Sequence, residues 1–223
     1  GQHPADVWRG DELESMVRSL QPDIITNAGP ETAGDFSTHE QTADGEDRPW
    51  EACFTMNDCW GYVPDEKNYK TTMQILGTLG HCAGLKGNLL LNVGPDSEGQ
   101  IPQIAADRLR SIGKWMRANG KAIYGSSRTV LRPPSELATS TRVGDKLYLL
   151  VHRWTGTTFA FAWVGNRVDH AKVVSTGQEA RVEQKGDRVW LHDLPQYAPD
   201  PDLSVIELEV DGQPKCPAER FHF

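Results

Sequence analysis

Hydrophobic and polar residues follow one period in the first half of the chain and another in the second. Up to about Ser127, apolar side chains recur at helical spacing in some stretches and form short continuous runs in others. This half is therefore predicted to alternate strands with helices. The predicted helices cover residues 11–20, 69–82 and 102–119, and the predicted strands cover residues 23–27, 50–56 and 89–93. The long polar segment between residues 28 and 49 is predicted to be a loop.

The clearest of these elements is the run at residues 89–93, which is bounded by Gly87 and by the Gly94-Pro95 pair. A short apolar run between such breakers is typical of a strand buried on both faces, as in a parallel sheet. Asn92 lies at the carboxyl end of this run, and ligands of α/β enzymes gather at the carboxyl ends of strands. The segment is therefore predicted to be a core strand that ends near a functional site.

After Ser127 the period changes to two, and Gly-rich turns separate the predicted strands. Regularly spaced strands with such turns predict an antiparallel sandwich. Pro133-Pro134 forms a stiff connector, so we predict an α/β unit at residues 1–127 and an all-β unit at residues 128–223. The predicted strands of the second unit cover residues 146–154, 158–164, 180–183, 189–191 and 203–210.

Composition excludes several classes of protein. The chain has 223 residues, 38% of them hydrophobic and 24% charged, and no apolar run approaches the roughly 18–20 residues of a membrane span. The net charge is −8 with no basic cluster, so we expect neither a nucleic-acid nor a membrane partner. The residues Gly-Gln-His-Pro at the start do not resemble a signal peptide, and the sequence leaves open a bacterial cytoplasmic or a secreted location for a soluble protein.

The four cysteines are too few and too scattered for a disulfide framework. Cys53 and Cys59 are close enough in sequence to pair, but we favour free thiols. Neither Cys-x-x-Cys nor His-Glu-x-x-His occurs, so we expect no metal site and no cofactor.

Acidic and aromatic residues concentrate between residues 27 and 62. Aromatic rings stack on the apolar faces of sugars, and carboxyl groups protonate a glycosidic oxygen or stabilise an oxocarbenium-like centre. This combination suits carbohydrate chemistry, although solvated acidic loops and buried tryptophans would give the same pattern.

Three blocks of sequence resemble the α-L-fucosidases of glycoside hydrolase family 29, in order and in spacing, over roughly the first 125 residues. The first block reads LQPDIITN at residues 20–27 and GDFSTHEQ at residues 34–41. The second reads WEACFTMNDCWGY at residues 50–62. The third reads GNLLLNVGPDSEG at residues 87–99, and continues as IGKWM at residues 112–116 and NGKAIYG at residues 119–125. The β-rich remainder resembles the C-terminal sandwich of the same family.

The resemblance implies a fold and an activity. The family has an irregular (β/α)₈-like barrel followed by a β-sandwich, and it hydrolyses α-L-fucosides with retention through a covalent fucosyl-enzyme. We therefore expect an α/β plus all-β fold, with a partial (β/α)₈-like barrel followed by an antiparallel β-sandwich. The expected substrate is a fucosylated oligosaccharide or glycoconjugate. On this basis Asn92 is expected to support the pocket rather than to perform the chemistry.

Retention needs two carboxyl groups about 5–5.5 Å apart, one acting as nucleophile and one as acid/base. By resemblance, Glu40 occupies the acid/base position of one bacterial branch, and Glu51 occupies that of another branch. We favour Glu40 and keep Glu51 as the alternative catalytic residue.

Four other residues are predicted to bind substrate. Trp60 matches an aromatic residue that lines the fucose pocket of the family. The remaining three predicted substrate-binding residues are Trp50, His39 and Asn27.

Two departures from the family pattern lead to a second hypothesis. The position that corresponds to the family nucleophile falls immediately before Gly1, and Asn27-Ala28-Gly29 stands where the family commonly has Asn-Asp-Arg. About three parallel strands also cannot close a barrel, which normally needs about eight. We therefore expect either a homo-oligomer or a complementing N-terminal half to complete the site. The alternative is a catalytically inactive, carbohydrate-binding or structural module derived from a fucosidase.

Overall fold

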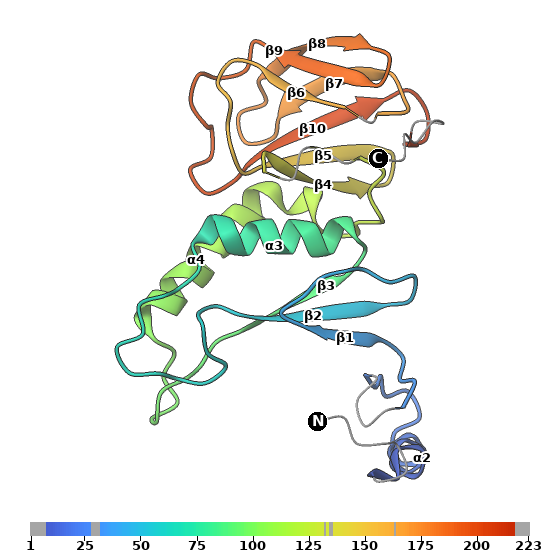
Figure 1. Ribbon diagram of the computed structural model, residues 1–223, viewed down its shortest axis with the longest axis vertical. Coiled ribbons are helices and arrows are strands. Elements are labelled where there is room, and N and C mark those ends of the chain that lie inside the picture. Colours follow the sequence, from blue (N-terminus) through green and yellow to red (C-terminus); the bar gives the residue numbers. More distant parts are fainter. Residues whose placement is uncertain (1–7, 28–31, 132, 134–135, 163, 217–223) are drawn as a thin grey trace.

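The computed structural model describes residues 8–27, 32–131, 133, 136–162 and 164–216 (Figure 1). Its elements form successive layers: a small parallel sheet, two long helices, and a larger antiparallel sheet that curls (Figure 1). Helix α2 (Gly10–Leu20) stands apart from these layers, beside the parallel sheet. The mixed α/β character of the first half and the strand-only character of the second half are as predicted.

Three parallel strands form the smaller sheet, in the order β1 (Ser37–Glu40), β2 (Trp50–Thr55) and β3 (Asn88–Asn92). Successive side chains of a strand point to opposite faces. One face carries Trp50 and Ala52, which pack against Cys82 of helix α3 (Thr72–Gly84). The other face carries Glu40 and Glu51, and this second face is largely exposed.

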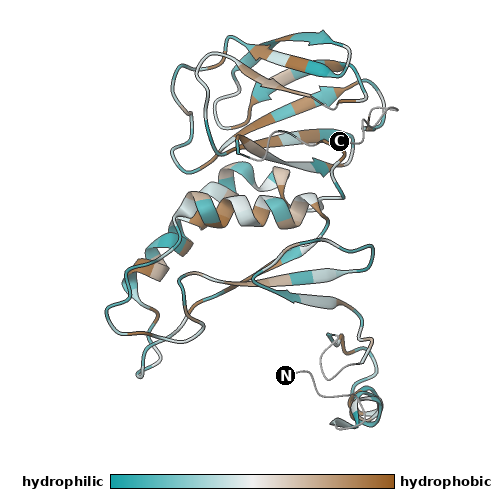
Figure 2. Cartoon of the chain, in the orientation of Figure 1, coloured by the Kyte–Doolittle hydropathy of each residue, from teal (hydrophilic) through white to brown (hydrophobic). Residues whose placement is uncertain are grey.

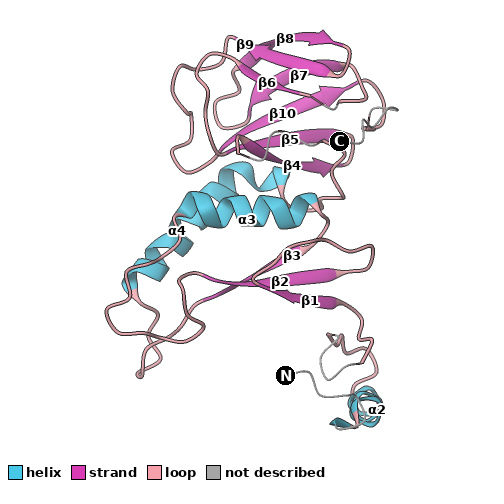
Figure 3. Cartoon of the chain, in the orientation of Figure 1, coloured by secondary structure: helices cyan, strands magenta, loops and turns pink. Residues whose placement is uncertain are grey.

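Helices α3 and α4 (Gln103–Asn119) lie between the two sheets (Figure 3). A capping box starts α3, because Thr71 Oγ1 accepts from the Gln74 amide and Gln74 Oε1 accepts from the Thr71 amide. At its other end α3 approaches strand β4 (Ala138–Val143) closely, since a Cβ on Gly84 would lie 2.2 Å from the carbonyl oxygen of Ser140. Only glycine permits this contact between the helix and the larger sheet.

Seven antiparallel strands form the larger sheet, in the order β4-β5-β10-β7-β8-β9-β6. Their inward-facing residues, such as Leu149, Phe159 and Leu208, form the largest core cluster. Figure 2 shows hydrophobic residues concentrated in these strands and in α3 and α4, while the parallel sheet is paler. The bounds are β5 (Lys146–Val151), β6 (Phe159–Phe161), β7 (Val168–Val173), β8 (Glu179–Lys185), β9 (Arg188–His192) and β10 (Ser204–Val210).

The prediction for residues 89–93 was right about the strand and wrong about its burial. Among the described strands, β3 has β2 as its only neighbour in the sheet, so it is an edge strand there. Leu89 and Leu91 pack towards the helices, whereas Leu90 points to the opposite face and is 49% exposed. A continuous apolar run predicts a strand with both faces covered by other elements. Within the described residues, only the face of β3 that points to the helices is covered.

Other local predictions also differ from the structure. Residues 23–27 form no strand and contribute a single bridge, between Asn27 and Phe36. Strand β1 lies inside the predicted long loop, and strands β4 and β7 were not predicted. Polar residues occupy all of β1, four of the six positions of β4 and half of β7, so their hydrophobic signal is weak. The apolar side chains of α2, which the helical period would bury, are largely exposed.

The division of the chain at residues 127 and 128 stays a prediction. Leu76 of α3 and Trp115 of α4 share a buried cluster with Leu150 and Val205 of the larger sheet, so the helical layer packs directly on that sheet. Pro134, part of the predicted connector, lies outside the described residues.

All four cysteines are unpaired. Among the described residues, no helix combines the length and the apolar character that a membrane crossing requires.

Candidate functional site

The exposed face of the parallel sheet brings the two predicted catalytic carboxylates near each other. Glu40 is the register partner of Cys53, and Glu51 lies two residues before Cys53 on β2. Because alternate residues share a face, all three side chains point to the same side, and strand geometry separates the Cα atoms of Glu40 and Glu51 by about 8 Å. Burial raises the pKa of the Cys53 thiol, and the charges of Glu51 and Glu40 raise it further. The pKa of the Cys53 thiol therefore depends on the charges of both carboxylates.

Glu40 and Trp60 both belong to the carboxyl edge of this sheet. Glu40 is the last residue of β1, and Trp60 is 40% exposed in the segment 56–70, here called the Trp60 loop, which follows β2. The loop packs on Gly94, because a Cβ there would lie 2.6 Å from the loop backbone. Asn92 ends β3, and its buried Oδ1 has no hydrogen-bond partner among the described residues.

Trp50 and His39 lie on the opposite face of the sheet. Trp50 is 1% exposed and packs towards α3. The His39 ring meets the Trp50 ring edge-on, with centroids 5.5 Å apart. His39 Nε2 lies 3.0 Å from Glu46 Oε1, which is within ion-pair range but without hydrogen-bond geometry. The structure thus places these two predicted substrate-binding residues behind β1 and β2, not beside Glu40.

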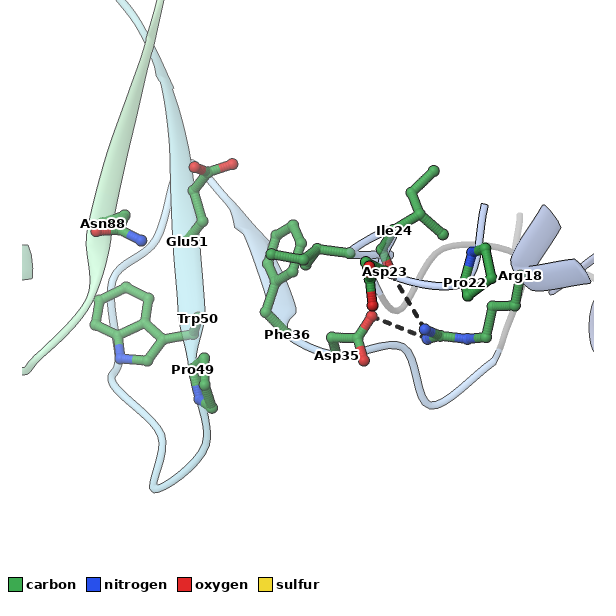
Figure 4. A pocket seen from close by; sticks show the side chains of 11 residues that line it. Arg18, Pro22, Asp23, Ile24, Asp35, Phe36, Pro49, Trp50, Glu51 and Asn88 are labelled. Carbon is green, nitrogen blue, oxygen red and sulfur yellow. Dashed lines mark hydrogen bonds and ion pairs between the residues drawn. The ribbon is translucent and has the colours of Figure 1, made fainter. Parts of the chain in front are cut away.

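Asn27 and Glu51 lie towards the amino edge of the sheet. Asn27 bridges Phe36, four residues before Glu40 and about 13 Å away along an extended strand. Glu51 lines a cavity of about 590 Å³ between this edge and the segment that follows α2 (Figure 4). Figure 4 shows Glu51 and Trp50 pointing in opposite directions from β2. Of the six predicted site residues, only Glu40 and Trp60 therefore belong to the carboxyl edge.

A charged cluster forms one wall of this cavity (Figure 4). Arg18 Nη2 donates to Glu14 Oε1 at 2.7 Å and to Asp35 Oδ2 at 2.9 Å. The Thr26 amide donates to the same Asp35 oxygen at 2.8 Å. This backbone hydrogen bond, followed by the Arg18 guanidinium, lowers the pKa of Asp35. The cluster ties α2 to the residues that lead into β1, and it gives Asp35 a structural contact.

A polar cluster at the carboxyl edge was not predicted from the sequence. Thr55 Oγ1 accepts from Gln41 Nε2 at 3.0 Å, and Lys70 Nζ donates to the Thr55 carbonyl oxygen at 2.7 Å. Gln41 directly follows Glu40, and Lys70 ends the Trp60 loop. No residue pattern signals these contacts, because the three side chains come from separate segments.

The comparisons with known proteins agree on one family. The family model described as alpha-L-fucosidase matches residues 2–121. The chain is 40% identical over 138 residues to the plasma alpha-L-fucosidase of Rattus norvegicus, a match that covers 56% of this chain. It is 38% identical over 136 residues to the alpha-L-fucosidase of Dictyostelium discoideum, which covers 55% of this chain.

Two solved structures extend the similarity to the larger sheet. Alpha-L-fucosidase isoenzyme 1 from Paenibacillus thiaminolyticus superposes with a TM-score of 0.82 at 33% identity, over 93% of this chain and 55% of that chain. An alpha-L-fucosidase from Vibrio sp. strain EJY3 gives a TM-score of 0.81 at 28% identity, over 96% of this chain and 41% of that chain. The chain spans 30% of the length of each of the rat and Dictyostelium relatives.

Proposed function

The chain belongs to the α-L-fucosidase family, and from this premise we propose that it is part of a retaining α-L-fucosidase that acts on fucosylated oligosaccharides or glycoconjugates. The observation that carries the proposal is the carboxyl edge of the parallel sheet, to which a strand-end carboxylate and the loop with an exposed indole both belong. The indole of Trp60 would stack on the apolar face of the sugar, and a carboxyl group would protonate the leaving oxygen.

The two sheets would correspond to the two parts of the family fold. The parallel sheet with α3 and α4 would be the C-terminal part of a (β/α)₈-like barrel, and the larger sheet would be the β-sandwich that follows it. The exposed face with Glu40 and Glu51 would then face the barrel interior. The proposed division of the chain between residues 127 and 128 separates the same two parts.

Position along the strands supports Glu40 as the acid/base. In barrels of parallel strands the reaction takes place at the carboxyl edge. Glu40 ends β1 at that edge, whereas Glu51 is the second residue of β2 and lines the cavity at the amino edge. Trp50, His39 and Asn27 would support the site from a distance, while Trp60 would contact the sugar.

The proposed pocket needs further polypeptide to close it. Strands β1 and β3 both present an edge within the described sheet, and the exposed face supplies no carboxylate that we assign as nucleophile. We propose that a second copy or a complementing N-terminal half supplies these parts. In the part of the chain that the structure describes, no further strand lies beside either edge of the parallel sheet (Figure 1).

The test combines activity with the mass of the protein in solution. The purified chain is assayed for release of the aryl group from an aryl α-L-fucoside, and light scattering gives the mass of the active species. Turnover by a defined oligomer is expected, and Glu40→Gln lowers kcat by at least about 100-fold. Glu51→Gln lowers it less than about tenfold.

The matched control is Glu179→Gln, which changes an exposed carboxylate on β8 of the larger sheet and leaves turnover unchanged. Full activity in Glu40→Gln, with activity lost in Glu51→Gln, would transfer the acid/base role to Glu51. Full activity in both variants would refute the site.

The second candidate is an inactive, sugar-binding module. The observation that favours it is that Glu40 and Glu51 are both candidates for one role, so the nucleophile is unassigned among the described residues. This candidate predicts no turnover by any assembly of the chain, together with a rise in melting temperature when L-fucose is added.

A further inference from the structure

We propose that Gln41, Thr55 and Lys70 form a positioning network that holds Glu40 and Trp60 at a fixed separation. The inference rests on the function proposed above and concerns the same edge of the sheet. Glu40 ends a strand and Trp60 belongs to a loop, and no direct bond between them is present in the described residues. A site built from two such segments needs a rigid connection, because small misplacements of reacting groups are costly.

Thr55 is the centre of the network. It ends β2 and is 2% exposed. Its Oγ1 donates to the Asn57 carbonyl oxygen at 2.5 Å and accepts from Gln41 Nε2 at 3.0 Å. One hydroxyl thus joins the start of the Trp60 loop to the residue that follows Glu40.

Lys70 closes the other end of the Trp60 loop. Its backbone amide donates to the Met56 carbonyl oxygen at 2.9 Å. Its ammonium donates to the carbonyl oxygens of Thr55 at 2.7 Å and of Asn57 at 3.3 Å. These bonds join the first and last residues of the loop, so the position of Trp60 depends on them. Among the described residues, the ammonium donates to uncharged oxygens alone, which suits a role in holding backbone.

Gln41 fixes the end of β1. Its backbone amide donates to the Cys53 carbonyl oxygen at 2.9 Å, which extends the sheet by one bond past Glu40. Its φ of 57° lies in the left-handed region, an uncommon conformation for a residue with a side chain. The bond from its side chain to Thr55 supports this turn. Since Gln41 follows Glu40 directly, the turn sets where the Glu40 carboxyl group points.

The network has two arms: the bonds of Lys70 to the Trp60 loop are the loop arm, and the bond of Gln41 to Thr55 is the strand arm. Substitutions at Lys70, Gln41 and Thr55 test the two arms. Lys70→Met removes the ammonium from the loop arm and keeps a long side chain. Gln41→Asn shortens the strand arm with a residue that tolerates positive φ. Thr55→Val removes the shared hydroxyl, and Thr55→Ser keeps it. Lys67→Met is the control, because Lys67 is an exposed residue of the same loop.

The first measurement does not depend on activity. The seven tryptophans are labelled with 5-fluorotryptophan, and the fluorine NMR signal of Trp60 is identified by its loss in Trp60→Phe. Lys70→Met and Thr55→Val are expected to shift or broaden the Trp60 signal, while Thr55→Ser and Lys67→Met leave it unchanged. An unchanged Trp60 signal in both Lys70→Met and Thr55→Val would overturn the proposal, whatever the activity.

The second measurement is the effect on KM and kcat with an aryl α-L-fucoside. Lys70→Met is expected to raise KM at least fivefold with little change in kcat, because it displaces a binding residue. Gln41→Asn is expected to lower kcat at least fivefold with little change in KM, because it displaces the acid. Thr55→Val shows both effects, and Thr55→Ser restores wild-type values. Equal losses in all variants, in parallel with lower melting temperatures, would reduce the network to a structural role.

Failure of the proposed function looks different from failure of this inference. If the wild type neither turns over the fucoside nor binds L-fucose, the function fails, and the Trp60 signal still decides whether the network positions the loop. If the wild type is active and the Trp60 signal moves without any change in KM, the network does not govern binding and the inference is wrong.

Discussion

Replacing Glu207 tests how the larger sheet is held to the helical layer. Glu207 lies on β10 and is 2% exposed, yet three ammonium groups contact its carboxyl oxygens. Lys146 and Lys172, on the neighbouring strands β5 and β7, lie 2.8 Å and 3.2 Å away. Lys121 lies 2.6 Å away and belongs to the short 3-10 helix η2 (Gly120–Ala122), which follows α4. The carboxylate thus joins three elements, including the end of the helical layer.

The size of the effect follows from the pKa of the carboxyl group. Burial on its own raises the pKa of Glu207, but the hydrogen bonds from Lys121, Lys146 and Lys172 outweigh it and lower the pKa from 4.5 to about 2. At about 1.4 kcal/mol per pH unit, the charged carboxylate stabilises the folded state by roughly 3 kcal/mol. Because the folded pKa is the lower one, this stabilisation is present above pH 4.5 and is lost as the pH falls through 2.

The assay is urea unfolding of the wild type and of Glu207→Gln at several pH values. At pH 7 the variant is expected to lose roughly 3 kcal/mol of unfolding free energy, and the difference shrinks steadily below pH 4.5. The control is Glu209→Gln, two residues along β10, whose carboxylate is 43% exposed and pairs with Lys146. This control costs less than about 1 kcal/mol. A Glu207→Gln loss below about 1 kcal/mol at pH 7, or one independent of pH, would refute the reasoning.

Three further predictions concern the other contacts described above. Gly84→Ala is expected to lower the free energy of unfolding by about 1–3 kcal/mol, because the new Cβ would collide with β4. The control is Gly113→Ala on α4, where a Cβ meets no close neighbour, and it is expected to raise the free energy of unfolding by up to about 1 kcal/mol. Thermal melting measures both effects. Glu51→Gln removes a charge that raises the pKa of Cys53, so the thiol should alkylate faster at neutral pH, and an unchanged rate would contradict the shared face. Arg18→Met breaks the bonds that hold α2, so amide exchange in that helix should quicken at least about tenfold, and normal protection would show that other contacts hold it.

The spacing of apolar residues predicted the helices and strands in which that spacing is regular. It missed the strands in which apolar residues are few. The helices at α3 and α4 and the strands at β2, β3, β5 and β10 have long apolar runs or clear periods. Strand β4, with the sequence ATSTRV, has few apolar residues, and it forms because β5 supplies a pairing partner. A strand that depends on its neighbour carries little signal of its own.

Burial was harder to predict than secondary structure. The exposure of Leu90 and of the apolar residues of α2 depends on what covers them, and no local pattern carries that information. The same limit applies to Glu207. Sequence alone predicts an exposed carboxylate there, and only the fold shows the three lysines that surround it. Isolated buried charges are rare because they need such partners, and partners from distant segments are visible only in the folded chain.

The register between β1 and β2 helps to choose between Glu40 and Glu51 as the acid/base, which sequence resemblance leaves open. Resemblance predicts the acid/base role for both Glu40 and Glu51, so resemblance alone leaves two candidates. The register pairs Glu40 with Cys53, which places Glu51 two residues deeper along β2, or about 7 Å further from the carboxyl edge. A sugar protonated by Glu51 would sit near the level of its register partners Thr38 and Asn88, away from the loop that carries Trp60. A sugar stacked on Trp60 at the carboxyl edge therefore favours Glu40 as its proton donor, because stacking and protonation must act on one substrate in one position.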